Sequence, residues 1–560
     1  MAVVPLVRKG FYLGSYPSFD PSAVPEGGVW RGRNVRISES GLLKIRPGSV
    51  PVGGPGGKTS IDAAISAFGD ILLIHDGSLH RMGTDGNLTL LEDSIETEGT
   101  PQMVRWTRAS KEEPEGKEMV YIFTGKGIWE TDGTPEGTQL VVPTVPSAEE
   151  NRPKNLLLKE GTENDPEQDL ESGPAQATIV LLRVSDGQRL VAAKDNTLWF
   201  SDPLDPGYWP VIQRVPLPQD GGRIVALSVW YGALIIFRDR DIWAYFRSDE
   251  TDLANRALVL QDRAVGCSAP GSVAHIPGAG IVFLGGPMGK TDNVFLLSQV
   301  QAIEGQVQAA PIGDPIHRQL IDAVNRYGID GVCSVYYQGV YRLSMPSNLG
   351  NDRVFVLTLT QTGQGWVTDT GPRNNLYVIH EGELYATKYN LGEVIKLTED
   401  SLTDEGHTIP VTIAFRREDL QPGPTAIKRL HVFATMRGRT VEDTLYWYGG
   451  VLGETVIGET FSTAATVVTG TPQHLEVEIL VEGEHISVKT IPVRIEQVEA
   501  DLGYEAVYIY EARFRPSLKA HFAQVQIKAT RPGEEIAILG YGLDVVPRRR
   551  TRGHYERGDN

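Results

Sequence analysis

The sequence predicts an all-β protein in which a β-propeller of about seven blade-like units, with six to eight compatible with the pattern, precedes a β-sandwich-like domain. Hairpin-like segments recur at a nearly constant spacing, and period-two alternation marks the C-terminal part of the chain. Helical periodicity is almost absent. The 61 glycines and 35 prolines suit the many tight turns that such folds need.

The chain begins with a strand-like segment, residues 1–50, which we expect to join the propeller. The propeller itself is expected over residues 51–397. Its repeat is an apolar or β-branched run, a tight polar turn and a second run that usually carries an aromatic residue. Seven copies begin at Ile71, Met119, Arg189, Ala233, Gly280, Val332 and Leu376.

The spacing of these hairpins matches one propeller blade. Five of the six intervals between turn centres are about 44 to 50 residues, close to the roughly 40 to 50 residues of a four-stranded blade. The exception, about 69 residues, contains an acidic segment near 147–174 whose composition suits a loop inserted between blades. One helix is expected, in PIHRQLIDAVNRYG from Pro315.

Aromatic residues recur at equivalent points just after the hairpin turns. They are Trp129, Trp199, Trp243 and Tyr341. A row of aromatics can stack against carbohydrate, but aromatics at one place in every blade more often fill the space between adjacent sheets. We therefore interpret them as structural residues of the blades.

A second domain is expected at 409–546, after the linker TEDSLTDEGH. Seven runs with period-two alternation favour an antiparallel β-sandwich-like module. A basic tail, residues 547–560, follows and contains Arg548, Arg549, Arg550 and Arg552. This tail can dock on an acidic partner surface, or it can be a solvated end of the chain.

Composition argues against several classes of function. The net charge of −18 and a pI near 5.2 are opposite to the basic footprint of nucleic-acid-binding proteins. No stretch approaches the roughly 20 apolar residues that a membrane-spanning helix needs. The two cysteines, Cys267 and Cys333, are expected to be reduced, buried thiols.

No catalytic, cofactor-binding or metal-binding pattern emerges. GGPGGKT from Gly53 and GGPMGKT from Gly285 resemble phosphate-binding loops, but Val52 and Leu284 stand where the first glycine is required. The eleven histidines show no metal-ligand spacing. We expect no cofactor and no enzymatic activity, although sequence alone does not show whether two carboxylates meet in a cleft, as glycoside cleavage requires.

Several segments, in their order along the chain, resemble the propeller proteins of bacteriophage tails. In the propeller region they are RLVAAKDNTLWFSDPLDPGYWP, GGRIVALSVWYGALIIFRDRDIWAYF, DRAVGCSAPGSVAHIPGAGIVFLGG and ELYATKYNLGEVIKL. EGGVWRGRNVRISESGLLKIRPG from Glu26 and the C-terminal EIAILGYGLDVVPRRR are similar to the first strands and the ending of such proteins. Within this group the chain is most similar to the tail nozzle or hub protein of short-tailed phages.

The resemblance implies a structural virion protein located in the tail and made in the host cytoplasm. Six copies would form a ring below the portal and adaptor, with a channel for DNA exit and attachment surface for spikes, fibres or a needle. The alternatives are a baseplate or fibre-attachment propeller, a carbohydrate-active propeller, and a cellular scaffold propeller.

Overall fold

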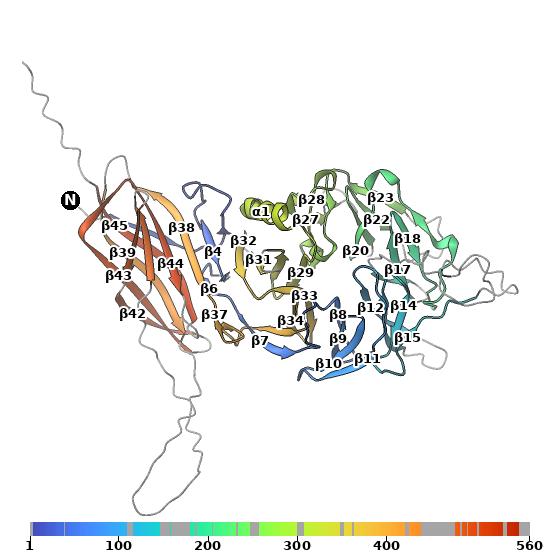
Figure 1. Ribbon diagram of the computed structural model, residues 1–560. Helices are drawn as coiled ribbons and strands as arrows, with labels where there is room; N and C mark the ends of the chain where they lie inside the picture. The colour runs from blue at the N-terminus through green and yellow to red at the C-terminus, as the bar shows by residue number, and fades with distance from the viewer. Residues whose placement is uncertain are drawn as a thin grey trace, which may run out of the picture. The chain divides into compact units, whose positions relative to one another are not determined.

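The computed structural model divides the chain into two compact units. The propeller unit comprises Ser49–Leu357 and Thr368–Thr398, and the sandwich unit comprises Met1–Gly48, Thr358–Val367 and Glu399–Asn560. The structure describes residues 4–38, 40–108, 116–145, 157, 180–184, 187–203, 205–230, 233–246, 257–299, 307–347, 352–360, 363–420, 425–437, 476–481, 484–489, 491–500, 503–529 and 535–547. Nearly all of the regular structure in these ranges is β-strand (Figure 1).

The propeller has seven antiparallel blades, which we number in chain order; the first five are separate sheets, and blades six and seven are parts of larger sheets. Blade six includes Thr358–Val367, a segment counted with the sandwich unit. Blade one is β8 (Ala63–Ala67), β9 (Asp70–His75), β10 (Ser78–Met82) and β11 (Leu88–Glu92), and blade two is β12 (Gln102–Arg108), β13 (Lys117–Phe123), β14 (Ile128–Thr131) and β15 (Gln139–Leu140). Blade three is β16 (Val180–Val184), β17 (Gly187–Lys194), β18 (Thr197–Phe200) and β19 (Val215–Pro216). Blade four is β20 (Ile224–Trp230), β21 (Ala233–Arg238), β22 (Ile242–Phe246) and β23 (Ala257–Asp262).

The remaining blades depart slightly from this pattern. Blade five is β24 (Gly266–Cys267), β25 (Ala274–Ile276), β26 (Gly280–Gly286), β27 (Asn293–Gln299) and β28 (Val307–Pro311), and blade six is β29 (Cys333–Tyr337), β30 (Val340–Met345), β31 (Arg353–Thr360) and β32 (Gly363–Thr370). Blade seven is β33 (Asn374–His380), β34 (Glu383–Lys388), β35 (Val394–Thr398) and β7 (Gly48–Gly53). The outer strand of the last blade therefore comes from the start of the propeller sequence.

The seven blades close into a ring. First strands of neighbouring blades contact one another from β8 through β12 and β16 to β20, and from β25 through β29 and β33 back to β8. Blades four and five meet through β21 and β24 and through β23 and β28. A closed circle of sheets joined along their first strands is a β-propeller.

The second strand of a typical blade is apolar throughout because neighbouring blades cover both of its faces. In β9, Leu72 and Ile74 lie in a core cluster shared with blade two, whereas Ile71 and Leu73 lie in a cluster shared with blade seven. A strand buried on both faces loses the period-two alternation of a half-exposed strand. The hairpins that the sequence signals as continuous apolar runs are explained in this way.

Tight turns and short helices connect the strands. Asp76 and Gly77, between β9 and β10, both have positive φ, as the favoured two-residue hairpin turn requires. The one α-helix in the described chain is α1 (His317–Tyr327), which buries Leu320 and Ala323, so the helix predicted after Pro315 is confirmed. Short 3₁₀ turns are η1 (Val211–Gln213), η2 (Gln219–Gly221), η4 (Pro270–Ser272), η5 (Pro287–Gly289) and η6 (Asp314–Ile316).

The sandwich unit has two sheets. One has the order β42 (Ile491–Ala500), β43 (Gly503–Ala520), β39 (Thr425–Arg437), β45 (Glu535–Pro547), β6 (Leu43–Ile45) and β5 (Val35–Ile37), with β1 (Val4–Lys9) also paired to β45. The other has β4 (Arg31–Arg33), β38 (Val411–Asp419), β44 (Phe522–Ala529), β40 (Glu476–Val481) and β41 (Glu484–Lys489) in that order. The short strands β2 (Gly14–Ser15), β3 (Gly28–Val29), β36 (Thr403–Asp404) and β37 (His407–Thr408) complete the unit.

The two sheets bury apolar faces against each other. Phe415 on β38 packs on Tyr541 of β45, with ring centroids 4.5 Å apart, and on Phe11, with centroids 5.1 Å apart. Leu430 and Val432 on β39 are fully buried. Aligned antiparallel sheets that share one apolar core form a β-sandwich.

The N-terminal segment differs from the sequence-based assignment. Residues 1–50 were expected to join the propeller, but residues up to Gly48 belong to the sandwich unit, where β1 and β6 pair with β45. Only β7 joins the propeller. The pairing partner lies some 500 residues along the chain, and no local pattern in residues 1–50 indicates it.

Three expected features lie wholly or almost wholly outside the described residues. The acidic insertion at 147–174 is described only at Leu157, and the tail 547–560 only at Pro547. The run DTLYWYG, expected as a strand of the second domain, also falls outside the described part of the chain.

Candidate functional site

A cluster of charged side chains surrounds a small cavity in the sandwich unit. Arg8 on β1 donates from Nε and Nη2 to the two carboxylate oxygens of Glu418 on β38, at 2.9 and 3.0 Å. Its third donor, Nη1, reaches Glu26 at 2.9 Å. The Glu418 side chain is only 5% exposed, whereas that of Glu26 is 79% exposed. Arg8 is thus clamped between one buried and one exposed carboxylate.

Two further side chains complete the surroundings of Glu418. The Tyr541 hydroxyl on β45 donates to Glu418 Oε1 at 2.9 Å, and Arg416 Nε lies 3.4 Å from the same oxygen. The hydrogen bond to Glu418 raises the pKa of Arg8, although burial opposes it, and burial raises the pKa of Tyr541 well above its usual value. Tyr541 is therefore a neutral phenol at physiological pH and can act as a donor.

The cavity beside this cluster has a volume of about 180 Å³. Its walls include Lys9, Phe11, Gly28, Arg416 and Tyr541. Sites for drug-sized ligands are typically about 300 to 1,000 Å³, so this cavity is small for such a ligand. Both carboxylate oxygens of Glu418 already accept hydrogen bonds, from Arg8 and from Tyr541. The arrangement therefore works as an electrostatic clamp that holds β1 on the sandwich.

No pattern in the sequence indicates this cluster. Arg8 and Glu418 are 410 positions apart, and each sits in an ordinary alternating strand. The pairing of Arg8 with Tyr541 across β1 and β45, and the packing of β38 from the other sheet against them, bring the three groups together.

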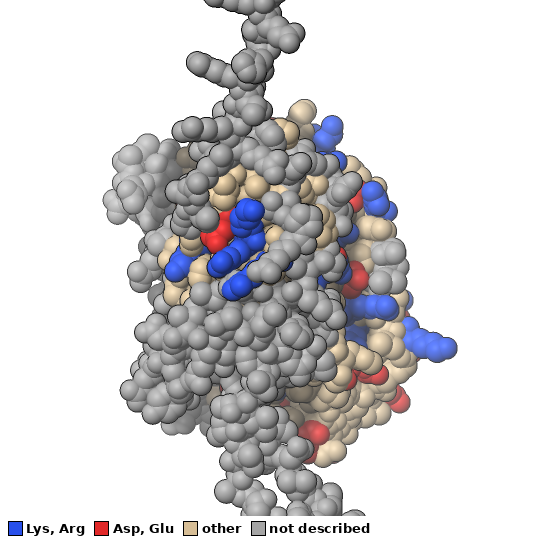
Figure 2. All heavy atoms as spheres, turned by 90° about the vertical axis from the view of Figure 1, so that its left-hand side faces the viewer, with Lys and Arg blue, Asp and Glu red and all other residues tan. Residues whose placement is uncertain are grey.

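The outer face of the sheet containing β39, β43 and β45 carries basic side chains. Arg429 on β39 and Arg513 on β43 are both exposed and lie opposite each other in the strand register. On its other side, Arg429 lies opposite Asp544 of β45. The Lys9 ammonium lies 5.0 Å from the centroid of the Phe433 ring on the same face. Figure 2 shows Lys and Arg side chains gathered on this side of the sandwich unit, next to acidic ones.

The three tryptophans named from the sequence occupy third strands. Each lies in the apolar cluster that its blade shares with the preceding blade. They are Trp129 on β14, Trp199 on β18 and Trp243 on β22. In these positions the indole rings fill space between blades.

Tyr341 is not equivalent to the tryptophans, which corrects the sequence-based assignment. It lies on β30, the second strand of blade six, is fully buried, and donates its hydroxyl to the Ser272 carbonyl at 2.9 Å. The predicted hairpins that begin at Val332 and Leu376 join the first and second strands of their blades. The other five predicted hairpins join second and third strands. The same turn chemistry occurs at both places, so the sequence signal does not tell them apart.

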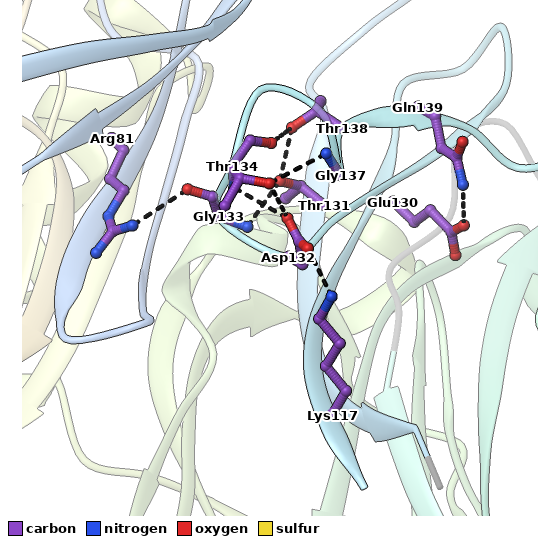
Figure 3. Close-up of polar contacts among 10 residues, drawn as sticks. All are labelled: Arg81, Lys117, Glu130, Thr131, Asp132, Gly133, Thr134, Gly137, Thr138 and Gln139. Atoms are coloured by element: carbon purple, nitrogen blue, oxygen red, sulfur yellow. Dashed lines mark hydrogen bonds and ion pairs between the residues drawn. The ribbon is translucent and has the colours of Figure 1, made fainter. Parts of the chain in front are cut away.

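A hydrogen-bonded turn sets the outer edge of blade two. Asp132 accepts from the backbone and hydroxyl of Thr134 at 3.0 and 2.6 Å and from the Lys117 ammonium at 2.6 Å (Figure 3). Arg81 of blade one donates to the Gly133 carbonyl at 3.2 Å. Burial favours a higher pKa for Asp132, but the hydrogen bonds from Lys117 and Thr134 outweigh it and lower the pKa. The turn leads directly into β15.

Both cysteines are free and buried. Burial raises the pKa of the Cys267 thiol and of the Cys333 thiol to about 12. Neither thiol is therefore ionised at neutral pH, and each packs as a small apolar side chain.

The remaining candidates from the sequence are the basic tail, the two phosphate-loop-like segments, metal sites and membrane-spanning helices. Arg548, Arg549, Arg550 and Arg552 lie outside the described residues. The two phosphate-loop-like segments lead into β8 and β27, without the helix that a P-loop requires. Within the described ranges, no group of three or more His, Cys, Asp or Glu side chains could hold a metal ion, and no helix is long and apolar enough to cross a membrane.

Comparisons with known proteins add little to this description. No family model and no curated protein matches the chain. Among solved structures, it is similar to the crystal structure of the WD40 domain of SCAP from fission yeast, with 9% identity and a TM-score of 0.29, over 61% of this chain and 85% of that domain. At this TM-score no property of that domain is carried over, and the fold assignment stays with the sheets described above.

Proposed function

We propose that this chain is a structural protein of a bacteriophage particle, the nozzle or hub ring of a short tail. Six copies surround a channel below the portal and adaptor, DNA leaves through that channel, and spikes, fibres or a needle attach to the ring. The protein acts through assembly and rigidity. Its chemistry is that of packed sheets and interfaces.

The observation that carries the proposal is where the phage-like segments lie in the fold. The four propeller segments fall on β17–β18, β20–β22, β24–β26 and β34–β35, which are consecutive strands of blades three, four, five and seven. The N-terminal and C-terminal segments meet as β6 and β45, where Leu43 pairs with Ile538. The resemblance thus follows structural elements of both units in chain order.

The distribution of charge also supports the proposal. The propeller unit has 28 Lys and Arg against 44 Asp and Glu, whereas the sandwich unit is close to balanced, with 25 against 27. A wall of negative charge repels phosphates and does not retain DNA. A conduit for rapid DNA exit benefits from this property.

The test is assembly. Purified protein, alone and mixed with portal–adaptor complexes from a short-tailed phage, is examined by mass photometry and cryo-electron microscopy. The expected result is a six-fold ring, in solution or on the adaptor. A stable monomer that never joins an adaptor ring would contradict the proposal. Hydrolysis of host glycans by the purified protein would favour the carbohydrate-active alternative.

A further inference from the structure

Exposed apolar side chains occur on or beside the outer strands of blades one to four. Patch A, on blades one and two, consists of Leu88, Leu90, Leu140, Val142 and Val145. Patch B, on blades three and four, consists of Val211, Ile212 and Val259. Among their described side chains, the outer strands β28, β32 and β7 of the other three blades expose no large apolar residue. The perimeter of the propeller is therefore asymmetric.

Both patches include residues of strands at the free edge of a sheet. Strands β11, β15, β19 and β23, like β28 of blade five, are the last strands of their sheets, each paired on one side only. Soluble proteins usually protect such edges with charged residues, prolines or a covering element. Leu90 on β11, Leu140 on β15 and Val259 on β23 are instead 48%, 43% and 41% exposed. An exposed apolar strand edge is stabilised when a partner covers it.

The exposed area suits a protein interface. At roughly 160 Å² for a fully exposed residue, patch A presents roughly 400 Å² and patch B roughly 200 Å² of mainly apolar surface. A contact between A and B buries roughly 600 Å² from these residues alone, against about 1,600 Å² in total for a standard interface, of which somewhat more than half is apolar. Smaller and polar neighbours supply the remainder.

The charges beside the two patches are complementary. Asp85 and Asp93 are exposed next to patch A, and Arg214 and Arg263 are exposed next to patch B. Asp220 is also exposed beyond patch B, but it lies 3.9 Å from an Arg238 guanidinium nitrogen, which partly offsets it. Apolar centres flanked by opposite charges fit one another better than each fits itself.

We infer that patch A of one copy binds patch B of the next copy, so that the outer edges of blades one to four form the lateral contact between copies of this chain. The inference rests on the proposed ring. The two patches occupy neighbouring pairs of blades and so are not on opposite sides of the propeller. Repeating such a head-to-tail contact turns the direction of growth and can close a ring.

The test uses one double variant for each patch. Variant A carries Leu90→Glu and Val142→Glu, variant B carries Ile212→Glu and Val259→Glu, and the control carries Met288→Glu. Met288 is 82% exposed but lies in the η5 turn between β26 and β27, so it is not part of an outer strand. Assembly is measured by mass photometry over a range of concentrations, and folding by circular dichroism and thermal unfolding.

In the expected result, wild type and control form rings, while variants A and B alone are folded monomers at concentrations at least tenfold above those at which wild type assembles. Mixing A with B gives 1:1 dimers that grow no further, because each retains one intact patch. This rescue also shows that both variants are folded.

Other outcomes separate this inference from the proposed function. Rings of wild-type mass from variants A and B overturn the A–B contact and leave the ring itself intact. Dimers formed by variant B alone overturn the head-to-tail arrangement, because they require contact between two A patches. If wild type assembles only on the adaptor, the same variants are compared there, and equal incorporation overturns the inference. Wild type that neither assembles nor joins the adaptor contradicts both.

Discussion

At the scale of single residues, Glu418 connects three segments that are far apart in sequence. Its buried carboxylate, on β38, accepts hydrogen bonds from Arg8 Nε, from Arg8 Nη2 and from the Tyr541 hydroxyl. A buried carboxylate is tolerated only when such partners replace water. Glu418 therefore adds a side-chain link to the backbone pairing that holds β1 on β45.

Replacing Glu418 with Gln should weaken this attachment by about 2 to 4 kcal/mol, because the Arg8 charge is left without its buried counter-ion. Hydrogen exchange of residues 4–9, measured by mass spectrometry, should become faster. Glu26→Gln is the matched control, since it removes the exposed partner of the same arginine and should change stability by less than about 0.5 kcal/mol. Equal effects of the two substitutions would show that burial of Glu418 is unimportant.

Acid should open the turn at residues 131–139. The pKa of Asp132 is lowered in the folded chain, so the unfolded state binds the proton more tightly. The stabilisation is fully present above the ordinary Asp pKa near 3.8 and is lost as pH falls through the lowered folded value. Hydrogen exchange at Thr134 and Gly137, corrected for intrinsic rates, should be protected at pH 5 and less so toward pH 3. Asp132→Asn should show weak protection at both pH values.

At the scale of elements, local turn chemistry made the hairpins predictable but not their place in the blade. Asp76–Gly77 in blade one and Gln338–Gly339 in blade six both have positive φ and look alike in sequence. The first joins second and third strands, and the second joins first and second strands. Which strands a turn connects is decided by the order in which strands line up from the centre of the ring.

The closure of blade seven depends on a close backbone approach at Gly392. Its carbonyl accepts the Gly56 amide at 2.8 Å, and a Cβ at position 392 would overlap the Gly56 carbonyl oxygen. Gly392→Ala should therefore cost about 1 to 3 kcal/mol and increase exchange in residues 48–53. Gly382→Ala, in an open turn of the same blade, should cost about 1 kcal/mol through its positive φ without affecting β7. Unchanged exchange in β7 of Gly392→Ala would refute this role.

At the scale of the whole molecule, charge and connectivity are unevenly shared between the units. The excess of acidic residues belongs to the propeller unit, and the sandwich unit is built from both ends of the chain. The sandwich unit cannot be completed until the last strand, β45, is available to β1 and β6.

The purified protein should not retain DNA. With its acidic excess, it should show no binding to a labelled duplex of about 25 base pairs up to roughly 0.1 mM protein at about 0.15 M salt, where basic proteins bind non-specifically at about 10⁻⁴ to 10⁻⁶ M. Fluorescence anisotropy measures this directly. Micromolar affinity with a steep salt dependence would contradict the repulsive conduit that we propose.

The sequence by itself determined the all-β class, the blade period, the helix after Pro315 and most strands of the second domain. These features are local: apolar runs, turn residues and alternation act over a few positions. Tertiary structure alone decided that residues up to Gly48 pair with β45, that β7 completes blade seven, and that Arg8, Glu418 and Tyr541 meet. Those partners are hundreds of positions apart in the sequence. Which distant strands pair depends on the three-dimensional fold, and the local pattern of neither segment indicates its partner.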